Sequence, residues 1–372
     1  MSSNVVEPPV RAAATRVPSS GPWGASLRPA KAAAPALVAL AAWLVHQLLP
    51  NKQLLPMTWM DGLPGWKHPY PLTLGFLLVV SFALGLAQYP WPRLRPWARH
   101  YLPLAAGGVG VLCLWDISTA KTAWLPQPFF PGPDEVFGAL IADTVYSAVT
   151  AFGAAGIPGA LDALTDDRAI LLVSTWHSLR LLLAGYALGV VFGFAWGVTI
   201  GWFRQARYWG MPVLKLVGPM PATALVPLVM MLSTDAFLCG TLLIAYAVWF
   251  PVTMLTSSGI ANVRLSYLDV ARTLGAGSRY LIFRVAIPSA LPNVFIGLFM
   301  GLGASFLTLI VAETVGVKAG LGWYLQWQKG YAEYAKVYAS LIIMAVFFST
   351  LMTLLFKIRD RVLKWQRGTI RW

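Results

Sequence analysis

The chain contains 372 residues, of which 58% are apolar and only 11% are charged. Soluble domains carry about 25% charged residues, so this composition excludes a soluble enzyme, a disordered scaffold and a disulfide-stapled secreted domain. Alternating segments of about ten residues, which are typical of a membrane barrel, do not occur. The composition therefore predicts an all-α polytopic membrane protein.

Apolar runs mark the predicted spans. Eight of them approach or exceed the roughly 20 residues that cross a bilayer as a helix. They lie at residues 34–50, 71–89, 101–118, 169–202, 211–232, 236–258, 288–313 and 336–356. Residues 143–165 are moderately apolar but broken by glycine and proline. We expect short helices at the outer surface there; the alternative, a further or re-entrant span, would invert the topology of everything after it.

The charge of the chain is a topology signal. The net charge is +14, and most of the 28 lysines and arginines fall in segments on the same side of the membrane as the two termini. Because Lys and Arg accumulate in cytoplasmic segments, both termini are predicted to be cytoplasmic. The basic segments are expected to contact anionic membrane lipids, whereas nucleic-acid binding is not expected.

The same patterns divide the chain into four parts. Residues 1–33, rich in Ala, Pro and Ser with scattered Arg, are expected to form a disordered basic cytoplasmic segment. Residues 34–100 hold the two weakest spans and residues 101–356 hold the other six. Residues 357–372 form a basic cytoplasmic tail.

The fourth run carries a glycine at every fourth position. Lipid tails offer no hydrophobic driving force for helix pairing, so close backbone approach along such a stripe supplies dispersion contacts. The stripe consists of Gly185, Gly189, Gly193, Gly197 and Gly201. It predicts a helix-packing face, either within the chain or between two copies.

A charge and a group of prolines suggest where a solute passes. Arg180, near the start of the fourth run, extends to the outer membrane surface, pairs with a carboxylate such as Glu313, or binds an anion. Prolines within a span free backbone carbonyls that can line a cavity, which favours residues 218–232 for the translocation path. The candidate path residues are Pro219, Met220, Pro221, Thr223, Arg180 and Glu313.

Residues 259–288 form the only long inside loop between the late runs. Ser266 followed by Asp269 predicts a capping box at the start of a helix, and Gly275 a left-handed residue after its end. An apolar face of Leu268, Ala271 and Leu274 follows helical spacing, and Ser278 is expected to begin a second helix that reaches Pro288. A rigid elbow with an apolar tip predicts docking into another protein.

This loop resembles the EAA loop of bacterial ABC importer permeases, whose pattern is Glu-Ala-Ala, three residues, Gly, nine residues, then Ile-x-Leu-Pro. The chain has Asp269-Val270-Ala271, Gly275 and Val285-Ala286-Ile287-Pro288 at the same spacing, with conservative replacements. Other blocks look like the nitrate/sulfonate/taurine/bicarbonate branch of that family. They are Leu125-Pro126-Gln127-Pro128, Ser178-Leu179-Arg180, Gly185, Pro219-Met220-Pro221-Ala222, Ala312-Glu313, Gly316 and Gly320-Leu321-Gly322.

The resemblance covers residues 104–356 and implies a permease subunit of a binding-protein-dependent importer for a small anion, in the bacterial cytoplasmic (inner) membrane. It implies that residues 262–287 form coupling helices. The residues assigned to this coupling are Ser266, Leu268, Asp269, Ala271, Leu274, Gly275 and Pro288. The implied partners are cytoplasmic ABC ATPase subunits, a second permease copy in a homodimer or heterodimer, and a periplasmic or lipid-anchored solute-binding protein.

Two features depart from the family pattern. Residues 232–237 replace the glycine-containing turn that is usual there, and the first two spans are additional to the usual six. The first departure leaves the identity of the solute open, and the second leaves the role of residues 1–100 open.

Other chemistry is not indicated. The sequence has no Gly-Lys-Ser/Thr of a Walker A loop, so the chain is not expected to be an enzyme, and ATP hydrolysis is assigned to a partner. Its four histidines lack ligand spacing, so neither a metal nor a cofactor is expected. An ion-coupled secondary transporter or channel-like protein is the main alternative, and a structural membrane anchor is the third.

Overall fold

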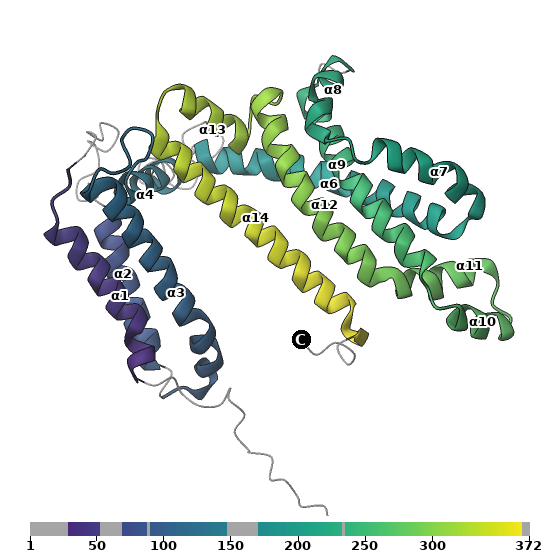
Figure 1. Ribbon diagram of the computed structural model, residues 1–372, viewed down its shortest axis with the longest axis horizontal. Helices are drawn as coiled ribbons and strands as arrows, with labels where there is room; N and C mark the ends of the chain where they lie inside the picture. Colours follow the sequence, from purple (N-terminus) through teal and green to yellow (C-terminus); the bar gives the residue numbers. More distant parts are fainter. Residues whose placement is uncertain (1–28, 53–68, 88–89, 147–169, 233–234, 367–372) are drawn as a thin grey trace, which may run out of the picture. The chain divides into compact units, whose positions relative to one another are not determined.

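The computed structural model describes residues 29–52, 69–87, 90–146, 170–232 and 235–366, and all regular structure in these ranges is helical (Figure 1). The first helices are α1 (Pro29–Leu48), α2 (Pro69–Ala87), α3 (Arg95–Asp116), α4 (Pro133–Ile141), α6 (Ile170–Trp202), α7 (Arg204–Val217) and α8 (Val226–Leu232). They are followed by α9 (Ala236–Ala261), α10 (Leu265–Thr273), α11 (Ser278–Tyr280), α12 (Ile287–Val315), α13 (Leu321–Gly330) and α14 (Tyr334–Val362). The predicted all-α class is confirmed.

Six described helical segments are long and apolar enough to cross a membrane. They are Pro69–Ala87, His100–Lys121, Ile170–Trp202, Ala236–Ala261, Ser278–Val315 and Tyr334–Val362. The predicted run at 211–232 is not one straight span, because α7 and α8 are bent by 82° where they meet. Pro219 and Pro221 at this break lack an amide N–H and disfavour helical geometry in the residues before them. The first predicted run is helical but shorter, with an apolar part at Ala33–Leu48.

The described residues form two compact units, one containing α1–α3 with residues 132–134, the other residues 127–131 and those from 135 onward. Helix α3 therefore packs with α1 and α2, although the predicted boundary lies at residue 100. Helix α1 begins inside the segment expected to be disordered, and in the predicted tail α14 extends to Val362 and is followed by a short 3-10 helix at Lys364–Gln366. Residues 1–28, 147–169 and 367–372, which include most of the uncertain 143–165 segment, lie outside the described residues.

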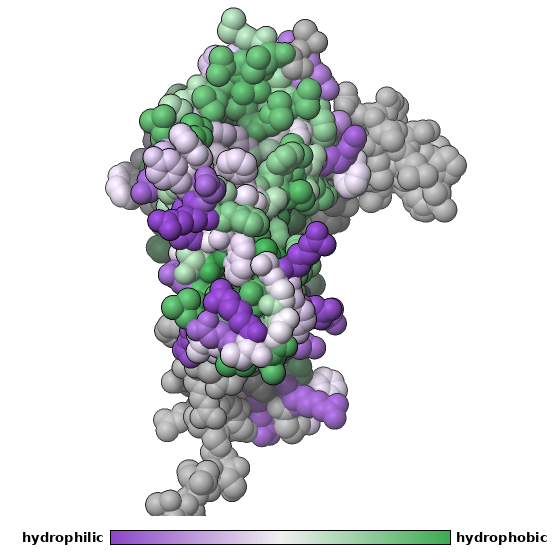
Figure 2. Space-filling model, turned by 90° about the vertical axis from the view of Figure 1, so that its right-hand side faces the viewer, coloured by the Kyte–Doolittle hydropathy of each residue, from purple (hydrophilic) through white to green (hydrophobic). Residues whose placement is uncertain are grey.

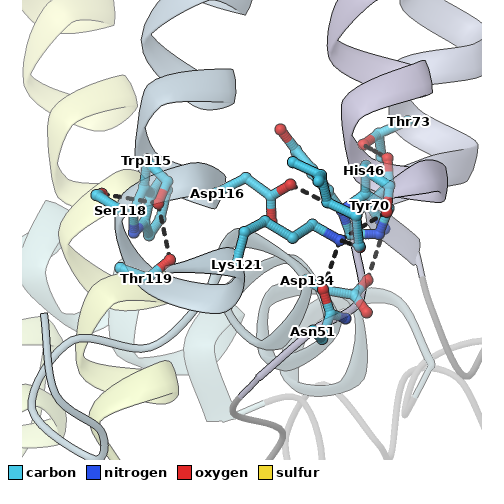
Figure 3. Close-up of polar contacts among 11 residues, drawn as sticks. His46, Asn51, Tyr70, Thr73, Trp115, Asp116, Ser118, Thr119, Lys121 and Asp134 are labelled. Atoms are coloured by element: carbon cyan, nitrogen blue, oxygen red, sulfur yellow. Dashed lines mark hydrogen bonds and ion pairs between the residues drawn. The ribbon is translucent and has the colours of Figure 1, made fainter. Parts of the chain in front are cut away.

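A buried polar cluster closes one end of the first unit (Figure 3). His46 Nδ1 lies 2.9 Å from Asp116 Oδ2, and Lys121 Nζ donates to the carbonyl oxygens of His46 (2.6 Å) and Leu49 (2.7 Å) at the end of α1. A cation there and a carboxylate at a helix start both complement the helix dipole. His46, which interrupts the apolar run in the sequence, is therefore a buried and paired residue.

Asp134 acts at the start of α2. Its carboxylate accepts a hydrogen bond of 2.9 Å from the backbone N–H of Tyr70, the second residue of the helix. The first amides of a helix have no partner within the helix, so this carboxylate satisfies one of them. The polar cluster thus supplies partners to the ends of both α1 and α2.

In the second unit, α6 and α9 lie side by side, and the glycine stripe forms their contact. A Cβ added at Gly185 would lie 2.5 Å from Ile244 Cβ, and one at Gly189 would lie 2.6 Å from the Ala245 carbonyl oxygen. Gly193, Gly197 and Gly201 meet Val252, Thr256 and Ile260 in the same way. The structure thus places the stripe inside the chain, against α9. Helix α12 packs along α9 as well, where Gly297 and Gly301 lie against Val252 and Val248.

Candidate functional site

The first part of the elbow is the short helix α10, which ends in a glycine-dependent motif. Gly275 has φ of +84°, as predicted. Its N–H donates to the Arg272 carbonyl at 2.9 Å, and the N–H of Ala276 donates to the Ala271 carbonyl at 3.0 Å. These two bonds form a Schellman motif, which satisfies carbonyls that the helix itself leaves unpaired. The turn after α10 is therefore closed by the backbone itself.

The start of α10 differs from the prediction. The helix begins at Leu265, and its N-cap residue Arg264 makes no capping hydrogen bond through its side chain. Ser266 is thus already inside the helix, and the predicted capping box is wrong. Asp269 instead accepts a hydrogen bond of 3.0 Å from Arg272 on the helix surface, and both side chains are exposed.

The second part of the elbow runs directly into a span. Helix α11 begins at Ser278, as predicted, and continues through a π-helical turn at Leu281–Ala286 into α12. Residues Ser278–Val315 form one helical segment of 38 residues. Pro288 lies in the first turn of α12, where a missing N–H is tolerated, and does not separate two elements.

The three residues of the predicted apolar face divide between two roles. Leu268 is buried and Ala271 packs beside it, whereas the side chain of Leu274 is 83% exposed. Leu268 belongs to a buried cluster whose other members are Ile260, Val263, Leu281, Ala286 and Ala290. Because this cluster joins α9, α10 and α12, it anchors the elbow to the spans. Leu274 is therefore the fully exposed member of the predicted face, and the half-buried Ala271 lies at its edge.

The exposed surface of the elbow is larger than the sequence pattern indicated. Its exposed apolar residues are Leu265, Tyr267, Val270, Leu274, Tyr280 and Phe283. A groove with a volume of about 580 Å³ opens there, lined by Tyr267, Val270, Leu274, Tyr280, Arg284 and others. In Figure 2, which shows the side on which α7, α10 and α11 lie, hydrophobic and hydrophilic side chains are interspersed, and hydrophobic ones dominate over α8 at the top.

The elbow is also cationic. Residues 259–288 contain a single acid, Asp269, which pairs with Arg272. The exposed basic residues are Arg264, Arg272, Arg279 and Arg284. An apolar groove surrounded by arginines has the chemistry of a docking surface for a protein with apolar and acidic groups.

A second polar site lies at the other end of α12. Glu313 is 1% exposed, and its carboxylate accepts from Ser178 Oγ at 2.6 Å and from the Gly322 N–H at 2.8 Å. Ser178 Oγ in turn accepts from the Leu321 N–H at 2.9 Å. Three sequence blocks from α6, α12 and the start of α13 thus meet at one point. We call this group of Ser178, Glu313, Leu321 and Gly322 the Glu313 node.

Arg180 is not part of the node. Its side chain is exposed, and the ion pairs between described residues do not include one between Arg180 and Glu313. Ser178, two residues earlier in the same sequence block, takes the place beside the carboxylate. The carboxylate of Glu313 is therefore held by hydrogen bonds from Ser178 and Gly322, and not by the ion pair with Arg180 that the sequence suggested as one alternative.

The remaining path candidates lie at the break between α7 and α8. Pro219, Met220, Pro221 and Thr223 are all exposed. Tyr246 of α9 donates a hydrogen bond to the carbonyl oxygen of residue 217 next to the break, which the sequence did not indicate. The six path candidates therefore do not form one surface: four lie at the break, Arg180 is exposed on α6, and Glu313 is buried.

In the part of the chain that the structure describes, six candidate spans, a bent helix pair and a cationic elbow together indicate a polytopic membrane transport subunit. Residues 189–367 match the family described as binding-protein-dependent transport system inner membrane component. The chain belongs to this family of ABC importer permeases. It is a multi-pass inner-membrane subunit and not itself an ATPase, and the family's mode of transport implies ATPase and binding-protein partners.

Three relatives show the branch. A putative aliphatic sulfonates transport permease of Bacillus subtilis is 30% identical over 184 residues (50% of this chain, 67% of the relative). The taurine transport system permease of Escherichia coli is 27% identical over 285 residues (75% and 93%). The bicarbonate transport system permease of Synechococcus elongatus is 27% identical over 255 residues (63% and 87%). Family membership sets aside the ion-coupled transporter and the structural anchor.

Proposed function

We propose that this permease carries a small anionic solute of the sulfonate, taurine, nitrate or bicarbonate type. The proposal rests on one observation: relatives named for sulfonates, taurine and bicarbonate align with this chain over most of their own length. These three solutes share a compact charged group with several oxygens. The path for such an anion runs past residues 218–232, where the bend leaves Pro219, Met220 and Pro221 exposed.

The elbow transmits force from the ATPase. Leu268 and Ala271 hold it to the spans, Gly275 closes its turn, and Leu274 enters a groove of the ATPase with the neighbouring exposed aromatic residues. Asp269 and Ser266 lie on its surface and Pro288 at its junction with α12. A short helix tied down at both ends moves as a rigid body with its partner.

Orientation and assembly follow from the same proposal. Both termini and the elbow face the cytoplasm, where the ATPase lies, because the basic residues gather there. Two permease copies pair to enclose the path, and a periplasmic or lipid-anchored binding protein delivers the solute from the opposite side.

Reconstitution tests the proposal. Proteoliposomes that contain the permease, its ATPase and its binding protein are expected to take up one of taurine, an alkyl sulfonate, nitrate or bicarbonate only when ATP is present. A thermal-shift screen of the binding protein selects the solute. Uptake driven by a solute gradient without the ATPase would contradict the proposal, as would uptake of none of the four anions.

A surface variant tests the elbow separately. Leu274→Asp places a charge on a side chain that is already exposed, so the fold is retained while the apolar contact with the ATPase is lost. We expect ATPase co-purification and ATP-driven uptake to be lost, and Leu274→Met, which remains apolar, to retain both. Equal uptake by the two variants would contradict the docking role.

A further inference from the structure

The elbow and the Glu313 node lie at opposite ends of one helical segment. Ser278–Val315 has 38 residues, and a helix of that length extends roughly 57 Å at 1.5 Å per residue. A bilayer with its headgroups is about 40–45 Å thick, so the segment reaches from one membrane surface to the other. Its first turns belong to the elbow, and Glu313 lies two residues before its end.

Helix α6 connects the same two places. At one end, Val198 and Trp202 of α6 pack against the buried cluster that anchors the elbow. At the other end, Ser178 donates its hydroxyl hydrogen to Glu313. Between these ends the glycine stripe holds α6 against α9, on which α12 also packs. The node is therefore the far end of a helix group whose near end carries the elbow.

The node binds the start of α13. Leu321 and Gly322 are the first residues of that helix, and their N–H groups have no acceptor within it. Ser178 Oγ and Glu313 Oε2 supply the acceptors from two other helices. The preceding Gly320 has φ of +100°, and a Cβ there would lie 2.2 Å from Glu313 Oε1. The backbone at residue 320 thus lies so close to the carboxylate that only glycine fits there.

The same end of α12 also contacts α8. Ala312, next to Glu313, is buried with Val226 of α8, and Met230 packs against this group. A Cβ added at Gly316 would lie 1.5 Å from Met230 Cε, so the tip of the Met230 side chain packs directly against the backbone that follows α12. Helix α8 is the second half of the bent pair proposed to line the path.

We propose that Glu313 is a positioning residue for transport: its carboxylate ties the start of α13 to α12 and α6, so that displacement of the elbow reaches α13 and α8 at the opposite membrane surface. Charge-assisted hydrogen bonds are shorter and stronger than neutral ones, which suits a connection that has to transmit movement. This inference rests on the proposed coupling role of the elbow, and it assigns Glu313 a role other than contact with the solute.

The test uses the complete transporter in lipid nanodiscs, with ATPase and binding protein. Both native cysteines are replaced, and a nitroxide label is attached at Lys329→Cys, an exposed position on α13. The readouts are solute uptake per ATP hydrolysed, measured in matching proteoliposomes, and the change in label mobility on adding ATP. The variants are Glu313→Ala, Glu313→Gln and Ser178→Ala. Glu333→Gln, which makes the same chemical change at a residue without a capping bond, is the control.

We expect Glu313→Ala to keep its ATPase and to hydrolyse ATP, while uptake per ATP falls by about tenfold and the label no longer responds to ATP. Ser178→Ala is expected to act in the same direction. Glu313→Gln, which retains acceptor and donor groups of the same length, is expected to restore part of the response. The control is expected to behave as the parent protein.

Two results would overturn the inference. One is a Glu313→Ala transporter with parental uptake per ATP and a responsive label. The other is loss of ATPase association in that variant, which would mean that the carboxylate serves folding of the helix group. Leu274→Asp, measured alongside, separates this inference from the proposed function. If Leu274→Asp leaves coupling intact, the elbow assignment fails; if it uncouples while Glu313→Ala does not, only the role of Glu313 fails.

Discussion

Gly275 is the residue on which the geometry of the elbow turn depends. Its φ of +84° is unfavourable by about 1–2 kcal/mol for a residue with a Cβ, although a Cβ there would meet no atom within 4 Å. Gly277, two residues later, has an ordinary φ of −73° and the same open surroundings. Alanine substitutions at these two glycines therefore differ in backbone strain but not in steric contact.

We therefore expect Gly275→Ala to destabilise the end of α10 by about 1–2 kcal/mol, and Gly277→Ala to have no such effect. Hydrogen exchange of the α10 amides, followed by mass spectrometry, measures the difference. Equal exchange in the two variants would show that the left-handed residue does not hold the turn.

Asp143 is a partly buried carboxyl group outside the candidate spans, and it accepts a hydrogen bond from Tyr324 of α13. Burial raises the pKa of Asp143 above its ordinary value of 3.8, and the bond from Tyr324 opposes this only in part. The folded state therefore holds the proton more tightly than the unfolded state. The resulting stabilisation is complete below the unfolded pKa and is lost as the pH rises through the folded pKa.

Asp143→Asn retains an acceptor for Tyr324 but cannot ionise. We expect its thermal stability to exceed that of the parent protein increasingly as the pH rises from about 4 to about 8, with the gap smallest at the acid end. Thermal unfolding in detergent at several pH values measures this gap. Asp360→Asn, at an exposed residue, is the control and is expected to run parallel to the parent. A gap that widens toward acid pH would contradict the assignment.

Among the elements, the α6–α9 pair shows how far sequence reasoning reaches. The four-residue spacing of the glycines predicted a packing face, since each glycine lies on the same side of one helix. The spacing does not identify the partner, so a face within the chain and a face between two copies were both compatible with it. The partner is identified by the shape of α9, where Ile244, Val248 and Val252 meet the glycines.

We expect Gly189→Ala to destabilise this pair by about 1–3 kcal/mol, because the added methyl would lie 2.6 Å from a carbonyl oxygen. Gly107→Ala is the matched control, since Gly107 is also helical and meets no atom within 4 Å. Denaturant titration in micelles, read by tryptophan fluorescence, gives the free energy of unfolding. Equal destabilisation by both substitutions would indicate a general effect of helix glycines.

The elbow was predicted in outline, and the errors have identifiable causes. Helical spacing placed Leu268, Ala271 and Leu274 on one face, but α10 ends at residue 273 and the chain turns there. Leu274 therefore leaves the face that the other two share. The exposed Tyr267 and Phe283 were missed because an aromatic residue in an apolar segment suggests core in a sequence without a structure.

At the scale of the whole molecule, the three-helix first unit precedes the part that matches the family. The buried cluster that anchors the elbow is formed entirely by residues between 198 and 290. Removing residues 1–100 therefore leaves the elbow and its anchor intact, while α3 loses its first six residues and its contacts with α1 and α2.

We expect this truncation to lower thermal stability but to leave co-purification of the ATPase unchanged. A pull-down through the ATPase checks this, with the full-length chain as the reference. Loss of the ATPase from the truncated protein would show that the first spans belong to the functional core.

The order of the long apolar helices could be read from the sequence because apolar length is a direct consequence of crossing a bilayer. Their number was overestimated, since the first of the eight runs is a shorter helix and the fifth is a bent pair. The Glu313 node could not be read in this way. Ser178 and Glu313 are 135 positions apart, and each looked significant only as part of a separate sequence block. The bend between α7 and α8 was likewise hidden, since a broken span has the same composition as a straight one.

The polar cluster of the first unit has a consequence for synthesis of the protein. Lys121 donates to the His46 carbonyl oxygen of α1, which is made 75 residues earlier, and Asp116 pairs with the His46 side chain, 70 residues earlier. While the ribosome has not yet produced α3, the first helix leaves these groups unsatisfied in or near lipid. The three helices are therefore expected to pack together only after α3 has been made.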